Sequence, residues 1–184
     1  FALWCSAALG LEVELAAAGV AAANYESYWP EIEGLALSDV TIDLPAALAE
    51  RGSFADLEPL HVLTTASLAR LRELLPDSAI AVERFRPGLV LDTGDAVGFI
   101  ENDWAGREAE LGEATIRFGS PSPRCVMTTR PQPGLDRDVA ILQTLATANR
   151  LPYGGFGDFA CLGCYAEVVS PGRISVGNEL HWAS

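Results

Sequence analysis

The chain has 184 residues, 49% of them hydrophobic and 20% charged, which is enough for one globular domain with a buried core. Its formal net charge is −13 and all 12 basic residues are arginines, which argues against binding to nucleic acid or to an anionic membrane surface. No apolar run is long enough to span a bilayer and four cysteines are too few for a disulfide framework, so we expect a cytoplasmic protein.

Residues 1–52 are predicted to be the remnant of an N-terminal region made of a helix, a strand and a connector. The sequence "FALWCSAALG" predicts a short helix that ends near Gly10, and the alternation in residues 11–15 predicts a strand. The connector that follows is rich in small residues, and three aromatic side chains are expected to pack it down: Tyr25, Tyr28 and Trp29. Since the chain lacks both an initiating methionine and the basic start of a signal peptide, we expect it to be the inside of a longer protein.

Residues 53–184 are predicted to form one domain that begins with a clear helix. In "PLHVLTTASLARLRELLP", a short apolar entry leads to Thr64 or Thr65 as the helix cap, and leucines recur at helical spacing before Pro76. The inward leucines are expected to be Leu68, Leu71, Leu74 and Leu75. The next segment, "RFRPGLVLD", predicts an extended run that begins at Pro87.

The middle of this domain alternates between apolar and polar residues. The sequence "GREAELGEATIRFGS" predicts two strands joined at residues 111–113. Their apolar positions are Ala109, Leu111, Ala114, Ile116 and Phe118. A further strand is predicted for "RCVMTT", and a second amphipathic helix for "DRDVAILQTLATANR". The inward positions of that helix are expected to be Val139, Leu142, Leu145 and Ala146.

The end of the chain predicts three more strands. A Pro171–Gly172 turn and a Gly177–Asn178 turn divide "CYAEVVSPGRISVGNELHWA" into a strand, a short strand and a last strand. Short strands interrupted by two helices are typical of an α+β domain whose sheet curls into a barrel. We therefore predict an α+β fold, mainly β, with peripheral helices.

Most motifs of known enzyme sites are missing. The sequence contains no G-x-G-x-x-G between a strand and a helix, no phosphate-binding P-loop, no H-E-x-x-H and no G-x-S-x-G. Cys161 and Cys164 form one C-x-x-C, but without a second pair it supports zinc only weakly, and the strand pattern after it favours two buried thiols. A Cys-His hydrolase would need His61 or His181 near Cys125, and the sequence excludes neither.

The segment "PSPRCVMTTR" makes Cys125 the best single candidate for chemistry. An arginine beside a thiol favours the thiolate, the form that binds soft metals, if both side chains point the same way. Successive residues on a strand point to opposite faces, so either Arg124 packs on the other side or Pro121 and Pro123 distort the strand. The alternative is a buried core cysteine. Because six of the 12 arginines fall within residues 84–130, a local basic pocket is also expected.

Five stretches follow one another along residues 53–184: "PLHVLTTASLARL", "RFRPGLVLD", "FIENDWAGREAELG", "PSPRCVMTT" and "YAEVVSPGRISVGNEL". In order and approximate spacing they resemble the MOSC domain, the C-terminal domain of molybdenum cofactor sulfurases, related to the mitochondrial amidoxime-reducing component. The resemblance implies a MOSC-type β-barrel with peripheral helices. It also implies that Cys125, at the cysteine of the P-R-C motif, is the catalytic residue and the protein ligand to molybdenum carried on a pterin dithiolene (molybdopterin).

The resemblance transfers further residues one by one. Arg84 and Arg86 match the flanking positions of the R-F-R-P stretch at the family's cofactor pocket, where guanidinium groups suit the pterin phosphate or its ring carbonyl. The family's next residue is an asparagine, but Gly88 stands here and removes one side-chain donor. Asp103 and Trp104 match an E-D-x-W stretch, for which a packed tryptophan with a turn carboxylate is the favoured interpretation.

Hydroxyl groups and one tyrosine complete the implied site. Thr64, Thr65 and Ser67 match a hydroxyl-bearing turn whose helix N-terminus could hold an anion of the cofactor. Tyr165 matches a tyrosine near the barrel mouth, and Arg124 belongs to the cysteine motif itself. All five are expected to bind cofactor.

The family activity that the resemblance implies is reduction of N-hydroxylated or N-oxide compounds by oxygen-atom transfer at a cysteine-ligated molybdenum. Two alternatives stay open. The domain could be a cofactor carrier or sulfur-transfer module working with a cysteine desulfurase, whose pyridoxal phosphate lies in that partner and not in this chain. It could also be a barrel that has lost the cofactor and binds another ligand or partner. Because no iron–sulfur cysteine set or flavin motif is present, reduction of a small-molecule substrate implies a separate electron-transfer reductase.

Overall fold

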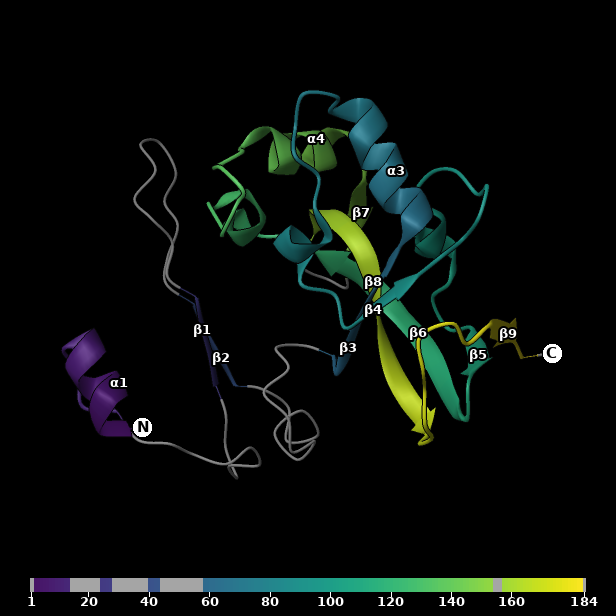
Figure 1. The fold of residues 1–184 in the computed structure, drawn as a ribbon, viewed down its shortest axis with the longest axis horizontal. Helices are drawn as coiled ribbons and strands as arrows, with labels where there is room; N and C mark the ends of the chain where they lie inside the picture. The colour runs from purple at the N-terminus through teal and green to yellow at the C-terminus, as the bar shows by residue number, and fades with distance from the viewer. Residues whose placement is uncertain (1, 14–23, 28–39, 44–57, 154–156, 184) are drawn as a thin grey trace. The chain divides into compact units, whose positions relative to one another are not determined.

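The computed structural model describes residues 2–13, 24–27, 40–43, 58–153 and 157–183 (Figure 1). The chain separates into two compact units, Phe1–Leu57 and Glu58–Ser184. The boundary predicted between residues 52 and 53 stays a prediction. No helix among the described residues has both the length and the apolar character to cross a membrane.

The first unit contains a helix and a two-stranded sheet. Helix α1 spans Ala2–Leu9, as predicted, and ends before Gly10, whose φ of +66° favours glycine. Strands β1 (Asn24–Ser27) and β2 (Val40–Asp43) pair antiparallel. The sequence predicted a connector without a strand at residues 24–27, which is wrong, because a strand of four residues is too short to show a clear alternation and its partners lie 13 to 19 residues further along the chain. Residues 11–13 form no strand, and the rest of the strand predicted for 11–15 lies outside the described residues, as do Tyr28 and Trp29.

The described part of the second unit is built on one seven-stranded sheet. Its strands are β3 (Leu60–Thr64), β4 (Leu89–Leu91), β5 (Glu108–Leu111), β6 (Ala114–Pro123), β7 (Arg150–Pro152), β8 (Asp158–Ser170) and β9 (Leu180–Trp182). The spatial order is β4-β3-β8-β6-β5-β9, and β7 pairs with β8 off this path. The β3–β4 pair is parallel and the others are antiparallel. The long strands β6 and β8 run side by side through the centre of the sheet (Figure 1).

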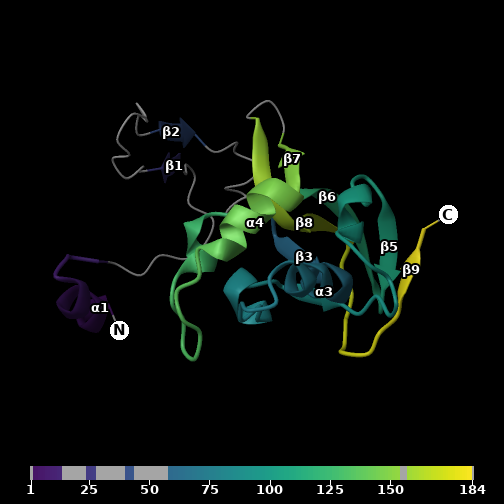
Figure 2. The ribbon, with the colours of Figure 1, turned by 90° about the horizontal axis from the view of Figure 1, so that it is seen from above.

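Two hydrophobic clusters lie on opposite faces of this sheet. Val62 and Leu63 are neighbours in β3 but belong to different clusters, because successive strand residues point to opposite faces. The Leu63 cluster includes Leu162 of β8 and the apolar faces of helices α3 (Thr65–Leu74) and α4 (Ala140–Ala148). These two helices lie close together on one side of the sheet (Figure 2). The fold is α+β and mainly β, with peripheral helices, as predicted.

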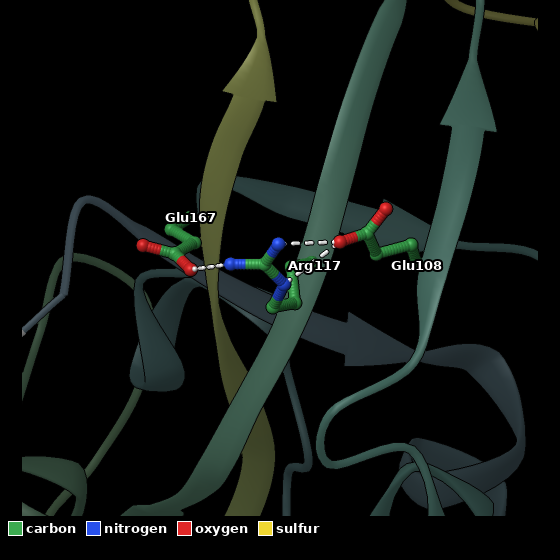
Figure 3. Close-up of polar contacts among 3 residues, drawn as sticks. All are labelled: Glu108, Arg117 and Glu167. Carbon is green, nitrogen blue, oxygen red and sulfur yellow. Dashed lines mark hydrogen bonds and ion pairs between the residues drawn. The ribbon is translucent and has the colours of Figure 1, made fainter.

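The β5–β6 hairpin follows the predicted alternation. All five predicted apolar positions are buried: Ala109, Leu111, Ala114, Ile116 and Phe118. On the other face, Arg117 lies across from Glu108 of β5 and from Glu167 of β8, and its guanidinium donates to both carboxylates (Figure 3). Arg117 is exposed and the two glutamates are partly exposed, so we expect the ion pairs to favour the strand register while adding little stability.

Helix α3 confirms the predicted cap and the inward Leu68 and Leu71, but the predicted Leu74 and Leu75 are only partly buried. Helix α4 corrects part of its prediction. Thr64 caps α3, and its Oγ1 accepts a hydrogen bond of 3.0 Å from the N–H of Ser67. In α4, Leu145 is buried as predicted, but the second buried position is Ile141, and the predicted Leu142 and Ala146 are only partly buried. The helix begins only after Asp138, whose carboxylate accepts from the N–H of Ala140, so predicted Val139 precedes it and is 43% exposed.

The strand predicted for residues 124–129 is wrong. Strand β6 ends at Pro123, and Val126–Thr129 form a 3₁₀ helix, η3. Both the N–H and the hydroxyl of Thr128 donate to the carbonyl of Cys125, and the hydroxyl of Thr129 donates to the carbonyl of Val126. Local threonine hydrogen bonds therefore replace the strand ladder that β-branched residues had indicated.

Of two other predicted extended segments, one is confirmed and one is corrected. Val82–Phe85 form a 3₁₀ helix, η1, and strand β4 (Leu89–Leu91) lies in the extended run that was predicted to begin at Pro87. The short strand predicted between the last two turns is absent from residues 171–179. There the chain is held by a pair of bonds between Glu113 and Arg173, and by the Asn178 carboxamide, which accepts from the N–H of Ser175.

Candidate functional site

Cys125 lies at the junction between the end of β6 and the 3₁₀ helix η3. Its backbone is extended, with φ −101° and ψ −179°, and its side chain is exposed. The N–H and the hydroxyl of Thr128 both donate to the carbonyl of Cys125 and so stabilise the turn. The exposure excludes the alternative in which Cys125 is a buried core residue. The thiol is presented at the surface on a backbone that both neighbouring elements restrain.

Arg124 points the other way and is part-buried. Its Nη1 donates to Ser122 Oγ and its Nη2 to the carbonyl of Phe85, each over 2.9 Å. Its Nε is buried and has no hydrogen-bond partner among the described residues. Burial lowers the pKa of Arg124, while the negative charges that Tyr165, Cys125 and Cys161 carry when ionised raise it. A guanidinium is therefore kept in a poorly solvated place within electrostatic range of the exposed thiol.

His61 of β3 lies against this guanidinium. Its Nε2 is 3.5 Å from Arg124 Nη1 and 3.1 Å from the carbonyl oxygen of Leu162. His61 also stands opposite Tyr165 in the β3–β8 register, with ring centroids 6.2 Å apart. Burial, and secondly the charge of Arg124, lower the pKa of His61 to about 4, so the ring is neutral at pH 7. We call Cys125, Arg124, His61 and Tyr165 the Cys125 cluster.

The free energy of unfolding should decrease as the pH is lowered, because of His61. Its pKa is about 6.5 when the chain is unfolded and about 4 when it is folded, so between these values the unfolded state binds more protons. As pH falls through this window, folding loses roughly 3 kcal/mol from this residue. Urea unfolding at pH 7, 5.5 and 4.5 measures the loss, and His61→Gln should show a flatter dependence. An equal pH dependence in both proteins would contradict the prediction.

Cys161 and Cys164 are both buried in β8, which confirms the sequence interpretation of two buried thiols in a strand. Burial raises the pKa of Cys161 to about 11. Burial, and then the nearby carboxylate of Glu101, raise the pKa of Cys164. Both thiols are therefore protonated at neutral pH and buried, whereas the Cys125 side chain is exposed.

The two arginines of the R-F-R-P stretch have different environments. Arg84 is 2% exposed, and its guanidinium donates to the carbonyls of Ala79, Arg130 and Asp136, so it ties three backbone segments together. Arg86 is exposed and has a φ of +51°, the left-handed conformation that a non-glycine residue rarely adopts. Arg86 directly follows Phe85, which binds Arg124, so it adjoins the Cys125 cluster.

The predicted hydroxyl groups have partners of their own. Thr64 Oγ1 donates over 2.8 Å, and Ser67 Oγ over 2.6 Å, to the carboxylate of Glu101, which is 1% exposed. Thr65 Oγ1 lies 3.1 Å from the hydroxyl of Thr93, which in turn accepts from the N–H of Ala66 at the start of α3. The helix N-terminus that could have held an anion is capped by these side chains.

The sequence reasoning missed Glu101, and it named His61 only as a possible partner of Cys125 in a Cys-His hydrolase. Glu101 opens the 3₁₀ helix η2 (Ile100–Asp103), which turns it inward, whereas Asp103 faces solvent. Besides the two hydroxyls, its carboxylate accepts a hydrogen bond of 3.1 Å from the N–H of Gly163. No spacing rule distinguishes the inward acid of such a turn from the outward one. For His61 the only signal was a polar residue in an otherwise apolar strand.

Two further predictions meet different outcomes. Trp104 is packed edge-on against Phe118 and Trp182, which supports its structural interpretation. The six arginines of residues 84–130 were expected to form one basic pocket, but they are dispersed among separate partners. The guanidinium carbon of Arg107, for example, lies 3.6 Å from the ring centroid of Trp182. This is a cation–π contact and not an anion-binding one.

The donor set around Cys125 is small. Among the described residues, no three His, Cys, Asp or Glu side chains are grouped so that they could hold a metal ion. The structure therefore brings together Cys125, Arg124 and Tyr165 of the predicted site, with Arg86 next to them. It separates Thr64, Thr65, Ser67 and Arg84 into hydrogen-bond networks of their own.

Comparisons with known proteins agree on the fold. A family model described as MOSC domain matches residues 49–181. The crystal structure of YiiM from Escherichia coli aligns at 18% identity with a TM-score of 0.50, covering 73% of this chain and 58% of that one. That of YiiM from Geobacillus stearothermophilus aligns at 16% identity with a TM-score of 0.46, covering 69% and 55%. The chain thus spans little more than half the length of these structures. A search of curated proteins finds no match.

Proposed function

The chain belongs to the MOSC domain family, and from this premise we propose that it binds a molybdenum cofactor through Cys125 and acts as an oxidoreductase on N-hydroxylated or N-oxide compounds. The observation that carries the proposal is the exposed thiol of Cys125 within electrostatic range of the part-buried guanidinium of Arg124. A solvent-accessible cysteine sulfur is open to a soft metal, and the guanidinium would offset part of the negative charge of a metal-bound thiolate. A β-barrel with peripheral helices was predicted, and the observed fold, a mainly β sheet curled into a half-barrel with a few helices, matches that of YiiM.

The residues present fit such a cofactor. The chain offers one soft donor, Cys125, and the described residues hold no metal-binding group of three, so a metal here must bring its remaining ligands with it. A pterin dithiolene does this. The buried Nε of Arg124 is a donor without a protein partner among the described residues. The exposed guanidinium of Arg86 would suit an anionic group of the pterin.

When bound, the cofactor would supply the two-electron change and the oxygen-atom transfer. The protein's own groups would bind and orient. Cys125 would ligate the metal as thiolate, and Arg124 would offset the added negative charge. Because His61 is neutral at pH 7, the positive charge of the Cys125 cluster would come from Arg124 and not from the imidazole. The chain has no iron–sulfur cysteine set, so we propose that electrons come from a separate reductase.

Molybdenum and pterin content per chain tests the proposal. The full-length protein would be purified anaerobically from a host that makes the cofactor, and then offered N-oxide and N-hydroxylated compounds with a chemical reductant. Near-stoichiometric metal together with substrate reduction is the expected result. A second molybdenum enzyme from the same cells serves as the control that the cofactor was made. If that enzyme contains molybdenum and this protein is folded but contains none, the proposal is overturned.

A second function is favoured by the same exposed thiol. Cys125 could carry sulfur as a persulfide delivered by a cysteine desulfurase, because an accessible thiolate attacks a persulfide sulfur readily. Mass spectrometry of the protein after incubation with a desulfurase and cysteine would detect an added sulfur on Cys125. Sulfur on Cys125 in protein that contains no molybdenum would favour this function over the first.

Restoring the family asparagine at position 88 should strengthen cofactor binding without harming the fold. A Cβ at Gly88 would meet its nearest neighbour, the carbonyl oxygen of His61, at 3.7 Å, which is ordinary contact. Gly88→Asn should therefore change Tm by no more than about 2 °C. Because it adds a donor, we expect higher molybdenum occupancy after dialysis. Gly88→Ala is the matched control, and equal occupancy in both variants would contradict the prediction.

A further inference from the structure

An exposed aromatic ring stands across the sheet from Cys125. Strand β6 pairs antiparallel with β8 as far as its last residue, and the N–H of Arg124 extends the pairing with a hydrogen bond of 2.8 Å to the carbonyl of Ala160. Because the backbone of Cys125 is still extended, the same register places this residue opposite Phe159. Residues opposite each other in an antiparallel pair share a face of the sheet. The thiol of Cys125 and the ring of Phe159 therefore lie on one face.

The ring of Phe159 is held on its other side. In the β7–β8 pair Phe159 lies opposite Leu151, so it stands between Leu151 and Cys125 in one row across the sheet. The ring of Tyr153 packs edge-on against it, with the two ring centroids 6.1 Å apart and the ring planes at 81°. Phe159 is nevertheless 38% exposed. Its neighbours therefore restrain the ring and leave part of its surface accessible to a ligand.

The chain that follows Cys125 also presents apolar side chains. Val126 and Met127 of η3 are 50% and 58% exposed. Exposed apolar side chains that gather in one place indicate a binding surface. The exposed sulfur is thus bordered by the aromatic ring on the neighbouring strand and by two apolar residues along the chain. A ligand that reaches Cys125 with its polar end would place its apolar part against these groups.

We propose that Phe159 is a specificity-determining residue, whose ring receives the flat aromatic part of a substrate while the oxygen-bearing nitrogen of that substrate lies at Cys125. The inference rests on the proposed function for the reacting group, and it adds the class of substrate that the site prefers. A flat aromatic ring can stack on Phe159 or meet it edge-on, whereas a saturated ring makes only ordinary apolar contact. The site should therefore bind aromatic N-oxides more tightly than saturated ones.

Equilibrium binding tests this preference on the full-length protein as purified, whether or not it contains molybdenum. Quinoline N-oxide supplies a flat ligand, and N-methyldecahydroquinoline N-oxide supplies the same two-ring skeleton in saturated form. Titration of each compound into ¹⁵N-labelled protein, followed by NMR, gives the Kd and the residues whose amide signals shift. We expect quinoline N-oxide to bind more tightly than the saturated compound and to shift the amides of Cys125, Met127 and Phe159.

Phe159→Leu is the decisive variant, because it keeps an apolar side chain and removes the flat ring. It should raise the Kd of quinoline N-oxide about fivefold and leave that of the saturated compound within about twofold of the wild type. Phe159→Tyr keeps the ring and should retain the preference. Val168→Ala is the matched control, since Val168 is another exposed apolar residue of β8 but lies opposite Ile116, and it should change neither Kd. Thermal unfolding checks that each variant is folded, and Phe159→Met replaces Phe159→Leu if that variant is not.

Three results would overturn the inference. They are equal Kd values of the two compounds for the wild type, an unchanged preference in Phe159→Leu, and amide shifts that lie away from Cys125 and Phe159. None of these measurements needs turnover, so a protein that prefers the flat ring but reduces no N-oxide would uphold the binding role of Phe159 while the proposed reaction fails. Where the protein does reduce N-oxides, the ratio of kcat/KM for the two compounds should fall about fivefold in Phe159→Leu.

Discussion

Replacing Cys125 by serine is expected to lower molybdenum content more than tenfold while leaving Tm within about 2 °C of the wild type. Serine is nearly the same size, but its hydroxyl stays protonated at neutral pH and is a poor ligand for a soft metal. The side chain is exposed, and the turn is held by backbone and threonine hydrogen bonds that the substitution does not touch. Metal analysis and thermal unfolding of the same preparations measure both quantities.

Cys5→Ser is the matched control, because it removes another cysteine that is only partly buried and lies in the first unit. It should retain both molybdenum and activity. If Cys125→Ser kept its metal, Cys125 would not be the ligand and the proposed function would fail in its central element. If molybdenum content and Tm fell together, the variant would have lost its fold. The measurement would then be made on Cys125→Ala.

Replacing Glu101 by alanine is expected to destabilise the fold by about 3 kcal/mol. Its carboxylate is the common acceptor for the hydroxyls of Thr64 and Ser67 and for the N–H of Gly163. Removing it leaves the Thr64 hydroxyl and the N–H of Gly163 without this acceptor and leaves the Ser67 hydroxyl only a long contact of 3.5 Å with the carbonyl of Gly98. Each buried unsatisfied donor costs about 1–3 kcal/mol unless the site relaxes or admits water. The network joins β3, α3, η2 and β8, so the loss should also loosen the segment next to His61.

Urea unfolding monitored by tryptophan fluorescence measures this loss, with an expected fall in Tm of about 10 °C in parallel. Asp103→Ala is the matched control, since it removes an acid two residues away in the same turn, and this acid is exposed. The control should change the free energy of unfolding by less than about 0.5 kcal/mol. A loss below 1 kcal/mol in Glu101→Ala would show that water replaces the carboxylate and that the network is not a structural centre.

Local patterns predicted the elements where one face of a strand or helix is buried. The alternation of residues 106–120 identified the β5–β6 hairpin because every second side chain enters the core. Helix α3 was identified by its cap and its leucines. The patterns failed at residues 124–129, where a 3₁₀ turn is held by backbone and threonine hydrogen bonds that β-propensity does not include.

For the candidate site, the amino-acid sequence alone established the family and singled out Cys125, because motifs and their order can be recognised without knowing which residues are in contact. It could not assign partners to the polar side chains around it. Arg84, Thr64 and Ser67 bind groups 5 to 52 residues away, and Glu101 and His61 join strands that meet only in the folded chain. Long-range hydrogen bonds depend on which segments the sheet brings together. The tertiary structure therefore decided which predicted ligands stand beside Cys125 and which hold the fold.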